Sequence, residues 1–381
     1  MNIGIDARLI LVNERGISNY IYNLVDNFIK IDKNNRYFLY INTKYEYATD
    51  KEKIRQKLGQ FAKEDNIIIK NIKSNGTFFW EQLYLPLAII RDKIDIMHMT
   101  SNRSPFLCGC RLINTMHDVM ELENIEKKDH YKLKTLKGKF YEWRVKQYIK
   151  FIYRRSFKKS DKIITVSEKS KKDIHKLLGI PENKIRVITH GIDEGFKNLN
   201  LNRRYIMTFG GTALQKNPEG PIEAYSYLPD KMKEKYPLLI VGSDDKTKIQ
   251  GILRRYNIKN FIIKEFVQKE ELVRLYNKSK IFLFLSVSEG FGFPPLEAMA
   301  CGTVPLAYNI SPMRENINNS RLCVEFKNNR KVSERIEELI RNKKDYNKLA
   351  LIGVKRSKSF SWQESAKKHL DIYKEIYKNE V

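Results

Sequence analysis

Two carboxylates, Glu289 and Glu297, flank a turn rich in glycine and proline within the stretch from Ser286 to Pro305, SVSEGFGFPPLEAMACGTVP. An apolar run predicts a buried strand before this turn, and LEAMA predicts a helix after it. A helix N-terminus presents several backbone N–H groups that can bind a phosphate or another anionic oxygen. Acidic groups beside such a site repel phosphate, so we expect both carboxylates to accept hydrogen bonds from hydroxyl groups of a sugar or ribose. A tight strand-to-helix connection with capping or solvated glutamates would show the same pattern.

A second candidate site is the loop from Gly210 to Asn217, which follows a predicted strand and precedes a predicted helix. Its two glycines, Gly210 and Gly211, would let the backbone approach a diphosphate closely. Lys216 would supply the counter-charge and a hydrogen-bond donor. The loop therefore predicts a diphosphate-binding turn.

Histidines in the first half of the chain follow predicted strands. His98 comes just past the strand predicted for residues 94–97, and the pair His117 and Asp118 comes after the next strand. Ligands of parallel sheets bind at the carboxyl ends of the strands. A neutral His117 imidazole can hydrogen-bond a sugar hydroxyl, and Asp118 can fix its tautomer or bind a substrate. A single histidine such as His98 is more often structural.

Alternating strand and helix patterns place these residues on parallel sheets. The first strand leads through a loop and Gly16 into a helix with apolar residues at helical spacing. One glycine is not a dinucleotide-binding fingerprint. The repetition of strand and helix predicts doubly wound α/β sheets, and 381 residues exceed one ordinary core, so we expect two domains.

The string Glu-Gly-Phe-Gly-Phe-Pro-Pro-Leu-Glu-Ala-Met-Ala-Cys-Gly-Thr, which begins at Glu289, resembles the signature of glycosyltransferase family 4. Members of that family are retaining enzymes that use nucleotide sugars and have the GT-B fold, two facing Rossmann-like domains with a cleft between them. The resemblance implies an acceptor-binding domain at residues 1–200 and a nucleotide-sugar-binding domain at residues 201–360. It also implies a final helix, within 361–381, that packs back on the first domain.

The resemblance further implies roles for the candidate residues. Glu297 would bind the ribose, Lys216 the diphosphate and Glu289 the hexose, and the catalytic residues would be Glu289, His117 and Lys216. The other contacts to the donor would come from Gly16, Gly210, Gly211, Asn217, Gly290, Phe291 and Gly292. His98 and Asp118 would contact the acceptor. No metal and no cofactor is implied, because the sequence lacks an Asp-x-Asp anchoring motif.

The chain departs from the family pattern near the predicted diphosphate site. Many members carry an arginine either six residues before the lysine or directly before it, and Gly210 and Gln215 stand at these positions. The missing positive charge would have to come from another residue, with Arg314 as a candidate. The Gly-Gly loop followed by Lys-Asn is similar to that of mannosyl-transferring members, which favours GDP-mannose as the donor.

Positive charge is concentrated between residues 127 and 160. The whole chain carries a net charge of +26, and this segment has thirteen basic residues against the two acids Asp129 and Glu142. Aromatic residues alternate with the basic ones, a pattern that fits adsorption to anionic lipid headgroups. A solvated basic face over a core stripe, nucleic-acid binding or a lysine-rich proteome would give a similar composition. We expect an anionic membrane surface as the partner of residues 127–160 and regard nucleic acid as the less favoured alternative.

Other features of the sequence favour a cytoplasmic enzyme. No run of 18 apolar residues occurs, and the first residues lack the pattern of a signal peptide. The four cysteines are too irregularly spaced for a disulfide framework or a zinc site. We expect a peripheral protein at the inner face of the membrane that moves a hexose to a lipid-linked sugar acceptor in polysaccharide or lipopolysaccharide assembly. A nucleic-acid-binding protein, a GT-B phosphorylase and a nucleotide-sugar epimerase are the alternatives.

Overall fold

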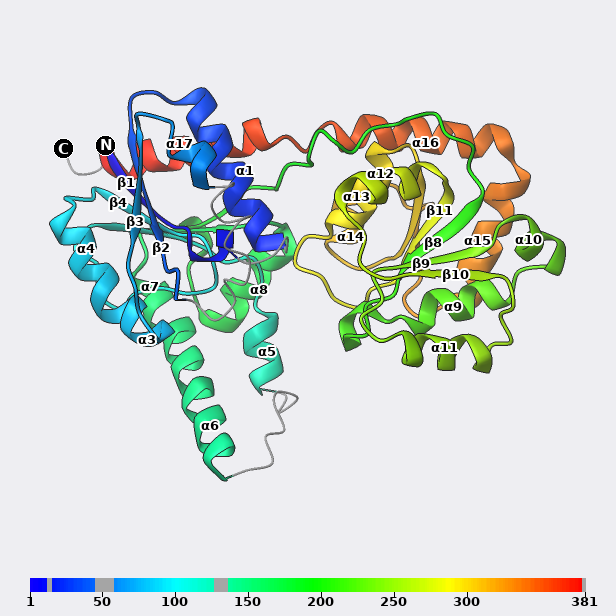
Figure 1. Cartoon of the computed structure of the whole chain (residues 1–381), viewed down its shortest axis with the longest axis horizontal. Coiled ribbons are helices and arrows are strands. Elements are labelled where there is room, and N and C mark those ends of the chain that lie inside the picture. The colour runs from blue at the N-terminus through cyan, green and yellow to red at the C-terminus, as the bar shows by residue number, and fades with distance from the viewer. Residues whose placement is uncertain (12–15, 45–57, 127–135, 379–381) are drawn as a thin grey trace. The chain divides into compact units, whose positions relative to one another are not determined.

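The computed structural model describes residues 1–11, 16–44, 58–126 and 136–378 (Figure 1). The chain divides into two compact units. Unit 1 comprises Met1–Gly191 and Trp362–Val381, and unit 2 comprises Ile192–Ser361. The first passage from unit 1 to unit 2 therefore lies at residue 191, earlier in the chain than the position near 200 that the sequence suggested.

Unit 1 is built on a parallel sheet in which seven described strands follow the order β3-β2-β1-β4-β5-β6-β7. The direction of strand addition reverses between β1 and β4, the position at which doubly wound sheets bind ligands. Strand β4 is buried along its whole length, as expected for a parallel sheet whose two faces are both covered. The strands are β1 (Asn2–Asp6), β2 (Arg36–Ile41), β3 (Ile67–Asn71), β4 (Ile96–Met99), β5 (Arg111–Thr115), β6 (Lys162–Thr165) and β7 (Ile185–Val187).

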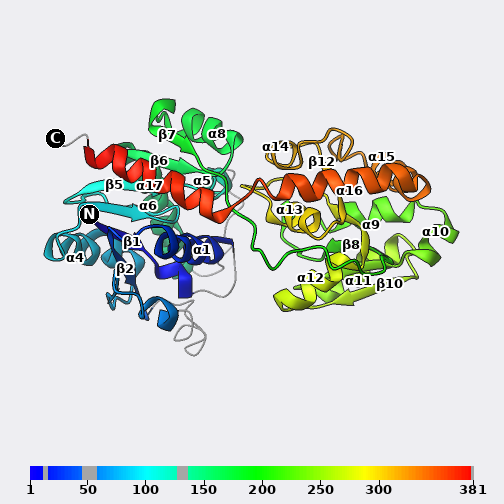
Figure 2. The same ribbon diagram turned by 90° about the horizontal axis from the view of Figure 1, so that it is seen from above.

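The helices of unit 1 include the last helix of the chain, α17, which packs against the first helix, α1 (Figures 1 and 2). Tyr20 of α1 places its hydroxyl oxygen 3.0 Å from Nε2 of His369 on α17. The helical elements of unit 1 are η1 (Arg8–Leu11), α1 (Gly16–Ile31), α3 (Thr77–Phe79), the π-helical turn η2 (Trp80–Tyr84), α4 (Leu85–Arg91), α5 (Met120–Glu126), α6 (Leu136–Phe151), the π-helical turn η3 (Ile152–Ser156), α7 (Phe157–Lys159), α8 (Glu168–Leu178), η4 (Glu182–Lys184) and α17 (Trp362–Lys378).

Unit 2 repeats the architecture on a smaller scale. Its described strands form a parallel sheet in the order β10-β9-β8-β11-β12-β13, which reverses between β8 and β11. The apolar run predicted before the Ser286 turn forms β11, which is buried from Ile281 to Phe284. The strands are β8 (Tyr205–Phe209), β9 (Leu238–Val241), β10 (Phe261–Lys264), β11 (Ser279–Phe284), β12 (Val304–Tyr308) and β13 (Cys323–Val324).

The helices of unit 2 carry the motif that the sequence singles out. Helix α13 packs closely on α16 at Gly353. A Cβ atom at this position would lie only 3.2 Å from the side chain of Met299. The helical elements are η5 (Leu214–Lys216), α9 (Glu219–Ser226), α10 (Asp230–Lys235), α11 (Lys246–Arg255), α12 (Lys269–Asn277), α13 (Phe293–Ala300), α14 (Met313–Ile317), α15 (Asn329–Arg341) and α16 (Lys343–Ser357).

Among the described residues, the structure contains no helix with the length and apolarity needed to cross a lipid bilayer.

Candidate active site

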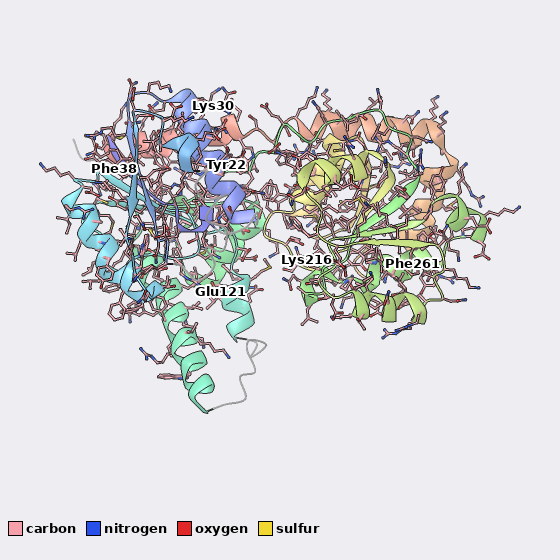
Figure 3. All side chains as sticks on the ribbon, in the orientation of Figure 1. Tyr22, Lys30, Phe38, Glu121, Lys216 and Phe261 are labelled. Atoms are coloured by element: carbon pink, nitrogen blue, oxygen red, sulfur yellow. The ribbon has the colours of Figure 1, made fainter. Side chains whose placement is uncertain are left out.

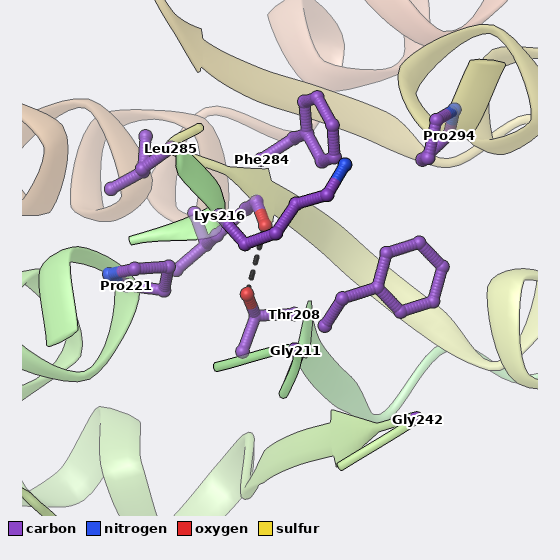
Figure 4. Close-up of a pocket in the computed structure, with 10 residues that line it drawn as sticks. Thr208, Gly211, Lys216, Pro221, Gly242, Phe284, Leu285 and Pro294 are labelled. Atoms are coloured by element: carbon purple, nitrogen blue, oxygen red, sulfur yellow. Dashed lines mark hydrogen bonds between the residues drawn. The ribbon is translucent and has the colours of Figure 1, made fainter. Parts of the chain in front are cut away.

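A pocket of about 220 Å³ opens at the carboxyl ends of β8 and β11, where the strand order of unit 2 reverses (Figure 4). Most of the residues that line it are apolar. The hydroxyl of Thr208, one of the polar lining residues, donates to the Leu283 carbonyl at 3.0 Å. The predicted diphosphate loop contributes two of its residues to the wall. The lining residues are Thr208, Phe209, Gly211, Lys216, Pro221, Gly242, Leu283, Phe284, Leu285 and Pro294.

Lys216 and Glu289 form an ion pair beside this pocket. Nζ of Lys216 lies 2.8 Å from Oε1 of Glu289, and the two side chains are 41% and 12% exposed. Figure 4 shows the Lys216 side chain extending across the pocket. The Ser286 hydroxyl oxygen lies 2.7 Å from the same Glu289 oxygen, at hydrogen-bond distance, and thereby helps to orient the carboxylate. The structure thus brings together a cation and an oriented carboxylate, the two groups that the sequence assigns to diphosphate and hexose.

The two loops that carry this pair are held to each other. The Ser286 hydroxyl oxygen also lies 2.6 Å from the carbonyl of Gln215, so its single hydrogen is shared between this carbonyl and Glu289. The same carbonyl accepts from the Val287 N–H at 2.9 Å. The Asn217 side chain donates to the Leu285 carbonyl at 2.8 Å from a left-handed backbone position with φ of 47°. The Asn217 side chain and the Gln215 carbonyl therefore hold the loop of residues 210–217 against the segment that follows β11. Sequence reasoning missed Ser286, since no local pattern reveals which distant carbonyl a serine will reach.

The glycines of the site differ in whether a side chain could replace the hydrogen atom. A Cβ atom on Gly210 would lie 2.8 Å from Cγ2 of Ile240, whereas on Gly211 its nearest neighbour would be the Lys216 side chain at 3.6 Å. Gly210 is thus required for packing against β9, and Gly211 leaves open backbone at the pocket wall. Gly292 precedes α13 with a φ of 88°, a left-handed position that favours glycine.

The start of α13 offers fewer N–H donors than the sequence analysis expected. Pro294 and Pro295 occupy two of the first positions of this helix, and proline has no amide hydrogen. Phe291 is buried among aromatic rings, and its carbonyl accepts from the Asn316 side chain. The helix start therefore offers fewer N–H donors than expected, and Lys216 is the positively charged residue among those that line the pocket.

Glu297 lies one turn inside α13 and is not among the residues that line the pocket. The hydroxyl of Tyr276 donates to its Oε2 at 3.1 Å. Burial raises the pKa of Glu297 to about 7, and the hydrogen bond from Tyr276 acts in the opposite direction. Its protonated form is therefore favoured more than in an exposed glutamate. No sequence pattern indicates Tyr276, which is the second residue of the site that sequence reasoning missed.

A second lysine lies at the diphosphate loop where the sequence lacks an arginine. Nζ of Lys248, in the first turn of α11, is 3.2 Å from the Thr212 carbonyl. The Thr212 N–H donates to Asp244 at 3.0 Å. Arg314, the candidate named from the sequence, lies on α14, and both Arg314 and Lys248 are exposed. Lys248 contacts the diphosphate loop itself and is the stronger candidate for the missing charge.

His117 of unit 1 is a neutral, oriented imidazole. Its Nε2 lies 3.0 Å from the carbonyl oxygen of Thr100. A carbonyl only accepts, so Nε2 carries the hydrogen and Nδ1 is the acceptor. Burial lowers the pKa of His117 to about 4, with the Thr100 hydrogen bond acting against this shift. The prediction of a neutral imidazole agrees with this environment.

Asp118 does not take the role of fixing that tautomer, because the Thr100 carbonyl does. The carboxylate of Asp118 accepts from the Met120 N–H at 3.0 Å, at the start of α5. Sequence adjacency misled here, since consecutive side chains after a strand point in different directions. Gly16 is the exposed first residue of α1, so a contact between its backbone and a ligand stays a prediction.

His98 lies in the core of unit 1, and an acceptor-binding role does not fit its surroundings. It is 0% exposed, with Nδ1 2.6 Å from the Tyr373 hydroxyl and Nε2 2.8 Å from the Thr115 hydroxyl. Strand β4 extends to Met99, so His98 lies inside the strand and not beyond its end. The placement of His98 past the strand is therefore wrong, and its contacts tie α17 to the sheet.

Four buried histidines of unit 1 gather around Tyr20. The ring of Tyr20 lies 5.0 Å from that of His117 and 4.9 Å from that of His190. The His369 ring lies 6.0 Å from that of Tyr20 and 5.6 Å from that of His98, measured between ring centroids. Burial lowers the pKa of all four imidazoles, so each is neutral at physiological pH. Among the residues that the structure describes, no group of three or more His, Cys, Asp or Glu side chains is arranged to hold a metal ion.

The basic segment lies partly outside the described residues, since 127–135 are not included. Its described part forms α6, η3 and α7, and α6 extends away from the sheet of unit 1 (Figure 1). Tyr153 and Phe157 belong to the core, whereas Trp143 and Phe151 are 56% and 42% exposed. Aromatic residues that the sequence grouped together therefore divide between core and surface. Figure 3 marks Glu121 on the neighbouring α5, which pairs with Arg103 at 2.8 Å.

Comparison with known proteins matches a glycosyltransferase sequence profile to each of the two units. The sequence profile described as Glycosyltransferase Family 4 matches residues 15–196, and the profile described as Glycosyl transferases group 1 matches residues 192–356. Serotype-specific mannosyltransferase WbdA of Escherichia coli is 28% identical over 235 residues, which cover 57% of this chain and 29% of WbdA. O-antigen chain mannosyltransferase B of Escherichia coli is 26% identical over 230 residues, which cover 56% of this chain and 60% of that protein. The chain thus spans less than two thirds of the length of these relatives.

Solved structures support the fold. The crystal structure of Anabaena HepE in complex with UDP and glucose superposes with a TM-score of 0.72 at 12% identity, covering 98% of this chain and 100% of that one. A similarity at such low identity concerns the fold alone. The two sequence profiles meet where unit 1 passes into unit 2 and together run from residue 15 to residue 356, so the chain belongs to glycosyltransferase family 4 and has the GT-B fold.

Proposed function

We propose that the chain is a retaining glycosyltransferase that moves a hexose from a nucleotide-diphosphate sugar to a sugar acceptor. The observation that carries this proposal is the pair of Lys216 and Glu289, 2.8 Å apart beside the pocket of unit 2. An ammonium group there suits a diphosphate, and a fixed carboxylate suits the hydroxyls of a sugar. Membership of family 4 supports the same activity.

Cleavage of the donor would place negative charge on the departing diphosphate. Lys216 would stabilise this charge, and stabilisation of charge that develops in the transition state is usually the largest catalytic effect. Its side chain is 41% exposed and can leave Glu289 when a diphosphate arrives. Glu289, still held by Ser286 at 2.7 Å, would then accept hydrogen bonds from the hexose.

Retention would follow from attack on the face from which the diphosphate departs, through a short-lived oxocarbenium-like ion pair. No enzyme nucleophile takes part in this scheme. In unit 1, Nδ1 of His117 can accept a hydrogen bond from a sugar hydroxyl, and in unit 2, Glu297 would bind the ribose. The proposal includes no metal and no organic cofactor, so EDTA should leave the rate of transfer unchanged.

The donor is proposed to be GDP-mannose and the acceptor a lipid-linked sugar in the assembly of a cell-surface polysaccharide or lipopolysaccharide. Both curated relatives described above are named mannosyltransferases, and one is named for the O-antigen chain. The place of action would be the cytoplasmic face of the membrane, with residues 127–160 next to anionic lipid. Transfer to a lipid-linked acceptor requires the enzyme, with its bound donor, to reach the membrane surface that holds the acceptor.

The test is a transfer assay with a panel of nucleotide sugars. Purified protein is incubated with GDP-mannose, UDP-glucose, UDP-galactose or UDP-N-acetylglucosamine and lipid-linked sugars extracted from a strain unable to elongate them. Mass spectrometry should show one added hexose from GDP-mannose, and the anomeric C–H coupling in the NMR spectrum of the product should show the same configuration as in the donor. Isomerisation of a donor without any acceptor would instead indicate an epimerase, and an absence of transfer from every donor would refute the proposal.

A further inference from the structure

The helical segment from Thr77 to Arg91 exposes a continuous set of apolar side chains on unit 1. Phe79, Leu83, Leu87 and Ile90 recur at helical spacing and are 58%, 46%, 57% and 65% exposed, and Phe78 beside them is 53% exposed. We call these five residues the apolar ridge. The spacing of three or four residues places Phe79, Leu83, Leu87 and Ile90 along one side of α3, η2 and α4, and Phe78 is the neighbour of Phe79 in α3.

The other side of the same segment is also apolar and packs into the core. Trp80, Leu85 and Ile89 are at most 1% exposed. Glu81 is the one charged residue between Thr77 and Ile90, and it is 0% exposed and paired with Arg8 at 3.0 Å. An apolar surface of this kind on a helix at the protein exterior marks a place of contact with a partner or a membrane.

The ridge is continuous with the basic segment. The ring of Phe78 lies 5.4 Å from that of Tyr148 on α6. Phe106, in the loop before β5, lies 5.2 Å from Phe151, and the ammonium of Lys159 lies 3.8 Å from the Phe106 ring. These contacts join α3, the loop before β5 and the end of α6 into one surface.

The charge around the ridge identifies its partner. From Trp143 to Ser160 the sequence has no acidic residue, and its basic residues are Arg144, Lys146, Lys150, Arg154, Arg155, Lys158 and Lys159. At the far end of the ridge Arg91 is exposed, and the neighbouring acid, Asp92, pairs with Arg91 at 3.0 Å and with Lys70 at 3.4 Å. Apolar side chains flanked by basic ones match a bilayer that carries anionic headgroups.

We propose that the apolar ridge inserts into an anionic lipid surface, with the basic residues of α6, η3 and α7 holding the headgroups around it. The proposal rests on the proposed function in one respect, since a lipid-linked acceptor explains why the enzyme needs the surface. It assigns different tasks to the two elements. The ridge provides apolar anchoring that salt does not weaken, and the basic segment provides attraction that salt screens.

The test is cosedimentation with vesicles of phosphatidylcholine alone or with 30% phosphatidylglycerol, at low and high salt. The variant Leu87→Glu/Ile90→Glu should lose at least about tenfold in apparent affinity for the anionic vesicles, because both side chains would enter the bilayer as charges. Leu351→Glu/Ile352→Glu is the matched control, since it adds the same two charges at exposed positions of α16 in unit 2, where Leu351 is 71% and Ile352 40% exposed. This control should bind vesicles like the unmodified protein.

A spectroscopic readout separates insertion from adsorption. Trp80 and Trp362 are 0% and 7% exposed, whereas Trp143 is 56% exposed, so Trp143→Phe removes the exposed indole. In that background Leu87→Trp should be quenched by brominated lipid chains. Unchanged vesicle binding of Leu87→Glu/Ile90→Glu, or absence of quenching in Leu87→Trp, would overturn the proposal. Conversion of a dimer to a monomer by the same variant, without effect on vesicles, would show a protein interface and overturn it as well.

The two proposals can fail independently. Transfer to a short, water-soluble acceptor should be equal in the ridge variant and the unmodified protein, because the ridge is remote in sequence from the donor loops of unit 2. Vesicle binding without any glycosyl transfer would refute the proposed function and leave the ridge assignment intact.

Discussion

Replacement of Glu289 by glutamine should strengthen the binding of a nucleoside diphosphate while it abolishes transfer. In the structure Lys216 is paired with Glu289 at 2.8 Å, so a diphosphate must compete with this carboxylate for the ammonium group. Glutamine is close in size to glutamate and keeps an oxygen for the Ser286 hydroxyl, yet it carries no charge. The change therefore removes the competitor without removing the loop contacts.

The expected size of the effect follows from the exposure of the pair. An ion pair with one partner 41% exposed contributes about 0 to 1 kcal/mol. Glu289→Gln should accordingly lower the Kd for the diphosphate by up to roughly fivefold. Lys216→Ala removes a charged hydrogen bond worth about 1.5 to 3 kcal/mol and should raise the Kd by roughly 10- to 150-fold. In the Lys216→Ala background the gain from Glu289→Gln should shrink, because no ion pair remains to be broken.

Titration calorimetry with GDP and UDP measures the Kd of the unmodified protein, of Glu289→Gln, of Lys216→Ala and of the double variant. The matched control is the pair of Lys30 and Asp26 on α1, 2.7 Å apart with side chains 63% and 17% exposed; Figure 3 labels both Lys30 and Lys216. Lys30→Ala and Asp26→Asn should leave the Kd unchanged. Weaker binding by Glu289→Gln than by the unmodified protein would refute the competition between carboxylate and diphosphate. Unchanged binding by Lys216→Ala would refute the diphosphate site itself.

Two further predictions concern pH. The pKa of Glu297 is raised to about 7 from its ordinary value of 4.5, so folding favours the protonated form and stability is lost as the pH rises between these values. Glu297→Gln should thus raise the melting temperature at pH 8, with a smaller gain at pH 5, while it weakens nucleotide binding; a gain independent of pH would contradict this account. The pKa of His369 is lowered to about 4 from 6.5, so stability is lost as the pH falls through this interval. His369→Gln should flatten the fall of the urea midpoint between pH 6.5 and 4; the same slope in His369→Gln and the unmodified protein would argue against this account.

The strand, turn and helix around Glu289 could be predicted because each is encoded locally. The apolar run forms β11, and the helix after the turn is α13, as the sequence analysis places them. The function of Ser286 could not be predicted, because its partner at Gln215 lies in a loop far away in the sequence. The sheet brings these loops together only when β8 and β11 pair.

The errors on the histidines have a similar origin. The end of a strand is poorly defined by sequence, and an error of two residues moved His98 from the interior of β4 to the loop beyond it. For His117 the sequence suggested the neighbouring carboxylate as its orienting group, whereas the Thr100 carbonyl takes this place. A backbone carbonyl leaves no mark in a sequence pattern, because every residue has one.

The return of the last helix to unit 1 determines the order in which the two units can be completed during synthesis. Unit 2 is a continuous stretch, residues 192–361, inserted into unit 1. A Cβ atom on Gly191 would lie 2.2 Å from the backbone nitrogen of Trp362, so the segment that leaves unit 1 and the segment that re-enters it meet at a glycine. Tyr20 and His98 acquire their partners His369 and Tyr373 only after all of unit 2 has left the ribosome. Domains generally fold as units during translation, so unit 2, although it is second in the chain, is the first that can fold to completion.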